Sequence, residues 1–168
     1  MFIRRTLIFT LLCCATLSFA HVTSGATTGK SPAADFTLKS NSGKNIKLSE
    51  LRGQVVMINF WASWCGPCRQ EMPLLDQLYK KYQPMGFTLL GVNVEDNPNE
   101  ATKWLKGKEV GFPILFDSES KVSELYNVSA MPTTLIIDRD GNMRYYHRGY
   151  VSDTEDEYQQ QIRELLKE

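Results

Sequence analysis

Several hydrophobic stretches of the chain are continuous and have the length of a β-strand. The segments 54–62 and 87–95 are apolar at nearly every position, as expected of central strands covered on both faces. A shorter strand is predicted at 112–117. Two more, at 133–138 and 143–150, flank the turn residues RDGN and predict a hairpin. The sequence therefore predicts a sheet built mainly from short, buried strands.

Between these runs the apolar residues recur with helical spacing. Helices are predicted at 67–82, with a kink at Pro73, at 99–108, ending near Gly107, and at 120–128. A last helix begins near Thr154 with acidic residues in its first turn, and it places four apolar side chains on one face: Tyr158, Ile162, Leu165 and Leu166. The segment 35–51 alternates around a turn and predicts an N-terminal hairpin. This order predicts an α/β domain, a mixed sheet with helices on both faces.

The first twenty residues follow a different pattern. Arg4 and Arg5 precede an apolar run that ends in small residues at Ser18 and Ala20, which is typical of a cleaved secretory signal over residues 1–20. The alternative is an uncleaved membrane anchor, because signal and anchor differ mainly in length and flanks. Residues 21–34 are small and polar and are expected to be a flexible lead-in to a domain over 35–168. The expected location is periplasmic or extracytoplasmic.

Composition narrows the class of protein. The chain has 168 residues, 42% hydrophobic and 23% charged, which suits one soluble domain with its own core. The 19 basic and 19 acidic residues balance, and no polybasic tract indicates nucleic acid as a partner.

The cysteines point to redox chemistry. Two of the four cysteines lie in the signal, so the mature chain keeps only Cys65 and Cys68, separated by Gly66 and Pro67. A disulfide across so short a loop adds little stability. Cys65 falls where a strand ends and a helix begins, and there the helix dipole favours a thiolate. Glycine permits the tight exit from the strand, and proline suits the first helical turn. We expect Cys65 to be the exposed nucleophile and Cys68, one turn further in, to be the buried resolving thiol.

Two other interpretations of the cysteine pair stay open. Half of a zinc site is one, but structural zinc needs four ligands, and His21 and His147 are not at ligand spacing. An inert structural disulfide is the other, disfavoured by the small loop and by the position at a helix start.

The motif WCGPC, the strand before it, Pro73 and the segment SAMPTT followed by a strand resemble the thioredoxin fold. The signal, the N-terminal hairpin and the additional segment 97–117 resemble its exported TlpA/ResA branch. That resemblance implies a thiol–disulfide oxidoreductase that receives electrons from a membrane protein and reduces apocytochrome c or other exported proteins.

The same resemblance assigns supporting residues. It implies a cis bond between Met131 and Pro132 that faces the cysteines, so that Met131 offers a backbone edge to a client; a trans proline opening a strand is the alternative. Asn59 stands where many thioredoxins have a buried, titrating aspartate. The branch instead implies an acid after the next strand, so we expect Glu95 or Asp96 to accept the proton of Cys68, unless both are merely solvated loop acids.

Other side chains near the motif are expected to have no direct part in the redox chemistry. Trp61 is predicted to pack near the site, and Trp64 to form an exposed rim that docks partners. Arg69 and Glu71 are predicted to lie on a solvated helix face. The segment 145–147, which contains His147, is predicted to lie on an edge strand and to take no part in catalysis.

The leading interpretation is therefore an exported protein-disulfide reductase. The Gly-Pro dipeptide resembles that of reducing thioredoxins, and the chain shows no cofactor site, so a membrane thiol reductant would have to supply electrons. A peroxidase related to peroxiredoxins is one alternative, although Ala62 stands where Thr or Ser would be needed. A peptide-binding or chaperone module with incidental thiols is the other.

Overall fold

The structure is a computed structural model that describes residues 27–108, 110–151 and 153–168. The predicted signal, residues 1–20, lies outside the described residues. Among the helices of the described part of the chain, none has the length and apolar character needed to cross a membrane.

A six-stranded mixed sheet forms the centre of the molecule, in the order β1-β8-β7-β4-β5-β6. Strand β4 pairs parallel with β5, as β5 does with β6, whereas β7 pairs antiparallel with both β4 and β8. The strands are β1 (Thr27–Pro32), β4 (Val55–Trp61), β5 (Phe87–Asn93), β6 (Ile114–Phe116), β7 (Thr133–Ile137) and β8 (Asn142–Arg148). The predicted mixed sheet and the C-terminal hairpin β7–β8 are confirmed.

The predicted N-terminal hairpin is confirmed as a separate two-stranded sheet. It comprises β2 (Thr37–Lys39) and β3 (Asn45–Lys47), and a single bridge from Ser40 to Leu115 connects it to β6. The 3₁₀ turn η1 (Leu48–Leu51) follows and leads into β4.

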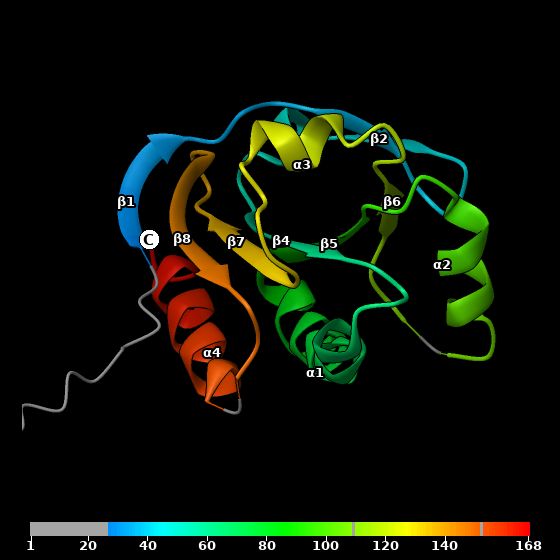
Figure 1. Ribbon diagram of the computed structural model, residues 1–168. Helices are drawn as coiled ribbons and strands as arrows, with labels where there is room; N and C mark the ends of the chain where they lie inside the picture. Colours follow the sequence, from blue (N-terminus) through cyan, green and yellow to red (C-terminus); the bar gives the residue numbers. More distant parts are fainter. Residues whose placement is uncertain (1–26, 109, 152) are drawn as a thin grey trace, which may run out of the picture.

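Helices cover both faces of the sheet, as predicted (Figure 1). Helices α1 and α4 lie on one face and α3 on the other, while α2 lies beyond β6 at the end of the sheet. The helices are α1 (Gly66–Tyr82), α2 (Pro98–Leu105), α3 (Lys121–Leu125) and α4 (Thr154–Leu165), and the 3₁₀ turn η2 (Gln83–Met85) follows α1.

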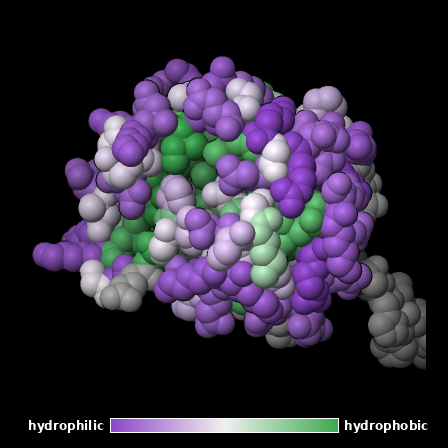
Figure 2. Space-filling view, turned by 180° about the vertical axis from the view of Figure 1, so that it is seen from behind, coloured by the Kyte–Doolittle hydropathy of each residue, from purple (hydrophilic) through white to green (hydrophobic). Residues whose placement is uncertain are grey.

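Alternate residues of the central strand β4 supply two hydrophobic cores. Because successive side chains of a strand point to opposite faces, Met57 packs under α1 and α4, and Ile58 packs under α3. All seven residues of β4 are buried, which explains its continuous apolar run. In the view from behind, apolar residues show between hydrophilic side chains that dominate the outer edges (Figure 2).

The first strand corrects the predicted domain start. Residues 27–32 were expected in a flexible lead-in, but they form β1, which pairs with β8 from Thr27 opposite Tyr146 to Pro32 opposite Asn142. Strand β8 is therefore not an edge strand. The stretch TTGKSP lacks apolar alternation because β1 lies at the edge of the sheet, where backbone pairing to one neighbour holds it.

Gly91, in the middle of β5, marks a close contact between the sheet and the segment before β6. A Cβ atom at this position would lie 2.8 Å from Cε2 of Phe112 and 2.9 Å from Cδ1 of Ile114. Both of these side chains are buried, so neither can move freely away.

We therefore expect Gly91→Ala to lower the free energy of unfolding by about 1–3 kcal/mol, the usual cost of overpacking a core. Denaturant unfolding checks this, with Gly66→Ala as the control because a Cβ there meets nothing within 4 Å. Equal stabilities for the two variants would contradict the packing argument.

Candidate active site

Cys65 caps the N-terminus of α1, directly after the loop that leaves β4. Its Sγ accepts a hydrogen bond of 3.2 Å from the backbone N–H of Cys68, which is one of the donors a helix start leaves unpaired. Gly66 and Pro67 are the first residues of the helix, as predicted. With no acidic residue in its first turn, α1 directs the positive end of its dipole at this sulfur.

Cys65 and Cys68 are joined by a disulfide, with their Cα atoms 5.3 Å apart. Cys68 is 1% exposed and Cys65 is 5% exposed, so the expected order of burial holds. The prediction that Cys65 is exposed is wrong for this oxidised form. Both bonded cysteines belong to the core beneath α1.

The segment before β7 lies at the same end of the sheet as the cysteines. Thr133 of β7 pairs with Phe60 of β4, one residue before the end of the strand that leads to Cys65. The Met131–Pro132 bond is cis, as predicted. Pro132 is buried and its carbonyl oxygen accepts from the N–H of Gly149 at 2.8 Å, whereas Met131 is half-buried.

The two tryptophans lie as predicted. Trp61 is fully buried in the core that contains Cys65, and its ring lies 5.5 Å from that of Trp104. Its Nε1 is buried without a hydrogen-bond partner, unlike the other buried side-chain nitrogen and oxygen atoms of the described residues. Trp64, directly before Cys65, is 67% exposed.

Glu95 fixes the loop that precedes Cys65. Its carboxylate accepts from the N–H and the Oγ of Ser63, at 2.8 and 2.7 Å, and from Nδ2 of Asn93 at 2.8 Å. Asp96 is exposed. Glu95 therefore has a clear structural task, and the expected proton transfer from Cys68 to either acid stays a prediction.

Glu71 corrects the predicted solvated face of α1. Its side chain is fully buried; Oε1 accepts from the Tyr158 hydroxyl and Oε2 from Nδ2 of Asn59, each at 2.9 Å. The same Nδ2 donates to Oγ1 of Thr134 at 2.9 Å. Burial raises the pKa of Glu71 to about 7, although both hydrogen bonds act in the opposite direction. Glu71 follows Cys68 by three residues, which places the two side chains on one face of the helix.

The sequence contained a signal for this buried acid. The buried positions Cys68, Leu75 and Leu78 recur at helical spacing, and Glu71 falls on the same stripe. Asn59 interrupts an otherwise apolar strand, and a buried polar side chain requires a partner. Together they indicated a polar pair between β4 and α1, which the assignment of Glu71 to solvent missed.

His147 extends the buried polar groups toward α4. It is 7% exposed, its Nε2 lies 2.8 Å from Oε1 of Gln161, and its ring meets that of Tyr158 edge-on at 5.1 Å. Burial, followed by the charge of Glu71, raises the pKa of Tyr158, so its hydroxyl remains a donor near neutral pH.

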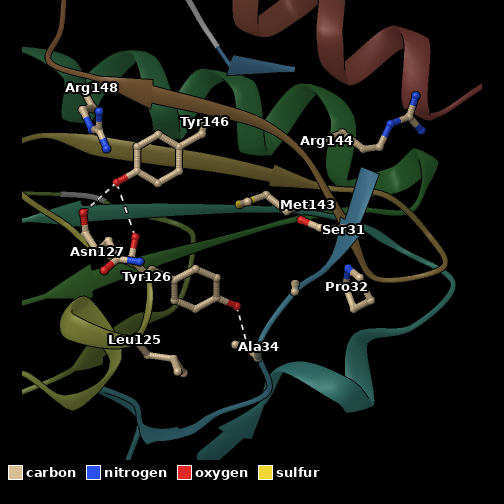
Figure 3. Close-up of a pocket in the computed structure, with 11 residues that line it drawn as sticks. Ser31, Pro32, Ala34, Leu125, Tyr126, Asn127, Met143, Arg144, Tyr146 and Arg148 are labelled. Atoms are coloured by element: carbon tan, nitrogen blue, oxygen red, sulfur yellow. Dashed lines mark hydrogen bonds between the residues drawn. The ribbon is translucent and has the colours of Figure 1, made fainter. Parts of the chain in front are cut away.

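A pocket of about 440 Å³ lies away from the cysteines, between β1, β8 and the end of α3 (Figure 3). Tyr126 and Tyr146 form part of its wall, and both belong to the core on the α3 side of the sheet. Their hydroxyls donate to the carbonyl oxygens of Ala34 and Asn127, at 2.6 and 3.1 Å. This pocket therefore contributes no group to the cysteine site.

Within the described ranges, no three His, Cys, Asp or Glu side chains are grouped to hold a metal ion.

Comparisons with known proteins identify a family and related proteins of known activity. The AhpC/TSA family matches residues 30–146. The thiol-disulfide oxidoreductase ResA of Bacillus subtilis (strain 168) is 32% identical over 146 residues, which are 85% of this chain and 82% of ResA.

Two solved structures share the fold. A candidate thiol:disulfide interchange protein DsbE from Chlorobium tepidum has a TM-score of 0.79 and 38% identity, over 83% of this chain and 99% of that one. The exposed lipoprotein thioredoxin Etrx1 of Streptococcus pneumoniae has a TM-score of 0.70 and 31% identity, over 79% and 100% of the two chains. The thioredoxin fold expected from the sequence is confirmed.

The burial of Glu71 predicts a specific pH dependence of stability. Because its pKa is about 7 in the folded protein and 4.5 in the unfolded chain, the folded state binds the proton more tightly. Glu71 therefore costs stability progressively as pH rises from about 4.5 through 7, by about 3 kcal/mol in all. Glu71→Gln does not titrate, so this variant should gain stability over the wild type at pH 8 and much less at pH 5.

Denaturant unfolding of the oxidised proteins at the two pH values checks this prediction. Glu100→Gln, which removes an exposed carboxylate, is the control and should follow the wild type at both. A Glu71→Gln variant whose difference from wild type is the same at pH 5 and pH 8 would show that Glu71 does not titrate as described.

Proposed function

We propose, from the premise that this chain belongs to the AhpC/TSA family and is a ResA-like thiol–disulfide oxidoreductase, that it reduces disulfides of exported client proteins. The observation that carries the proposal is the Cys65–Cys68 pair at the start of α1, with the buried Glu71 one turn further along the same helix face. A structural disulfide has no use for a buried acid that titrates near neutral pH. A side chain that accepts a proton during catalysis is most effective when its pKa lies near the working pH.

The first step is attack on the client by reduced Cys65. In the disulfide form the Cys65 sulfur accepts a hydrogen bond from the N–H of Cys68. In the reduced form the same N–H and the helix dipole stabilise the Cys65 thiolate. It displaces one sulfur of the client disulfide, which leaves as a thiolate and takes up a proton. Cys65 and the client are then joined by a mixed disulfide.

The second step releases the client. In this proposal the Glu71 carboxylate, in place of the Glu95 or Asp96 expected from the sequence, takes the proton of the Cys68 thiol. The Cys68 thiolate then attacks the sulfur of Cys65. The Cys65–Cys68 disulfide forms, and the second client sulfur leaves and is protonated. In sum, the client disulfide gains two electrons from the protein dithiol. Its two thiolates take up one proton from Glu71 and one from the solvent, which received the proton of Cys65 when that thiol ionised. Asn59 and Tyr158 hold the carboxylate in place throughout.

The cis segment supplies a place for the client backbone. Met131 is half-buried and lies before β7, at the end of the sheet where Cys65 is. An extended client segment pairs with this backbone edge as an added strand would, which brings its cysteine to Cys65. Trp64, exposed beside Cys65, adds apolar contact area.

Electrons must come from another dithiol. The proposed reductive direction follows from the Gly66-Pro67 dipeptide, which resembles that of reducing thioredoxins. The protein acts as a relay that a membrane thiol reductant recharges. The proposed route to the clients is export through residues 1–20, followed by cleavage, or by retention of that segment as an anchor.

Trapping tests the proposed division of labour between the thiols. With Cys68→Ser, the mixed disulfide on Cys65 has no resolving thiol, so a disulfide-linked complex with insulin or a client should accumulate. Cys65→Ser should form no complex and should reduce insulin at the background rate of dithiothreitol alone. Non-reducing gels and insulin turbidity measure these outcomes, with the doubly substituted protein as control. Full activity in Cys65→Ser would assign attack to another group.

The equilibrium potential tests the proposed direction. Equilibration of the pair against glutathione buffers should give a value nearer to about −270 mV, as in reducing thioredoxins, than to about −120 mV, as in strong oxidants. Mass spectrometry after alkylation measures the reduced fraction. A potential near the oxidising limit would assign the protein to disulfide formation.

A further inference from the structure

A groove runs along the outer face of α1, beside the active site. Its volume is about 530 Å³. The α1 wall is a stripe of residues at helical spacing, namely Arg69, Met72, Pro73, Asp76, Gln77 and Lys80. The facing wall comes from α2 and the segment after it, and it contains Trp104, Lys108 and Val110.

The floor of the groove is apolar and includes a ring suited to peptide contacts. Trp104 is half-buried; its indole packs against Trp61 in the core beside Cys65. The Lys108 ammonium lies 4.4 Å from the centre of the Trp104 ring, and it donates to the Trp104 carbonyl oxygen at 2.6 Å. An exposed cation therefore borders a partly buried aromatic surface.

Basic side chains outnumber acidic ones among the described residues that line the groove. Among the described lining residues, the one carboxylate is that of Asp76, which pairs with Lys80 at 2.6 Å and accepts the N–H of Gly111 at 2.7 Å. Arg69 and Lys108 carry the remaining charge, since both are exposed and neither forms an ion pair with a carboxylate of the described residues. Beyond Lys108, a neighbouring hollow adds two more cations, Lys103 and Lys106.

The groove begins where a client would be held. Arg69 donates to the carbonyl oxygen of Ser63 at 2.9 Å, and its backbone N–H bonds to the carbonyl oxygen of Cys65. Lys80, at the far end, lies fifteen residues after Cys65 on the same helix, which is about 22 Å along the axis. An extended chain covers that length in about seven residues.

From this charge and this distance we propose that the groove binds an extended, acidic segment of the client polypeptide, within about seven residues of the cysteine that Cys65 attacks. Apolar side chains of the segment lie on Pro73 and Trp104. Its Glu or Asp side chains face Arg69 and Lys108. The proposal rests on the proposed function and adds a preference among disulfide substrates.

Two disulfide peptides test the preference. They are identical except that one carries glutamates, and the other glutamines, at four to seven residues on either side of its cysteines. The reduced wild-type protein should reduce the acidic peptide with a second-order rate constant at least about threefold larger, at about 0.01 M salt. The ratio should approach one at about 1 M salt, where exposed charges are screened.

Variants assign the preference to the groove. Lys108→Glu should abolish or invert the ratio of the two rate constants, whereas Lys167→Glu, the same charge change at the exposed end of the chain beyond α4, should keep the wild-type ratio. An equal reduction of both peptides by the wild type, or an unchanged ratio in Lys108→Glu, would overturn the groove proposal and leave the reductase intact. Reduction of neither peptide by the dithiol protein would overturn the proposed function itself.

Discussion

A single buried carboxylate connects the elements around the redox pair. Glu71 of α1 accepts hydrogen bonds from Asn59 of β4 and Tyr158 of α4, and Asn59 also donates to Thr134 of β7. A buried carboxylate is costly unless it is hydrogen-bonded, so these donors must stay in place for the fold to hold. The same burial raises the pKa of Glu71 into the range where a side chain can take a proton and give it back. Stability and chemistry therefore constrain the same four side chains.

Strand β4 explains how one sequence segment can position so much of the site. It lies between β5 and β7, with each of its residues buried, so its end is fixed from both sides. Parallel pairing brings Asn93 and the loop acid Glu95 to that end, and antiparallel pairing brings Thr133 and the cis-proline segment there. Cys65 begins α1 at the place where these elements converge. The order of strands, more than any single contact, makes this end of the sheet the reactive one.

The sequence predicted those features that depend on local pattern. The apolar run of β4, the cysteine spacing and the capping position of Cys65 follow from periodicity and helix-end chemistry, and the cis bond at Met131 followed from resemblance. Features that depend on distant partners were missed. Strand β1 has no apolar alternation and exists because β8 offers it a backbone edge. Glu71 was assigned to solvent because its donors lie twelve residues before it and eighty-seven after it in the chain.

The register of β1 also fixes where the polypeptide enters the domain. Thr27 is paired with Tyr146, toward the end of β8 at which Arg148 lies opposite Thr133, directly after the cis proline. Thr27, the first described residue, therefore lies toward the reactive end of the sheet. A pulling force applied at Thr27 therefore acts on an edge strand held by one neighbour, at the end of the sheet where Cys65 begins α1.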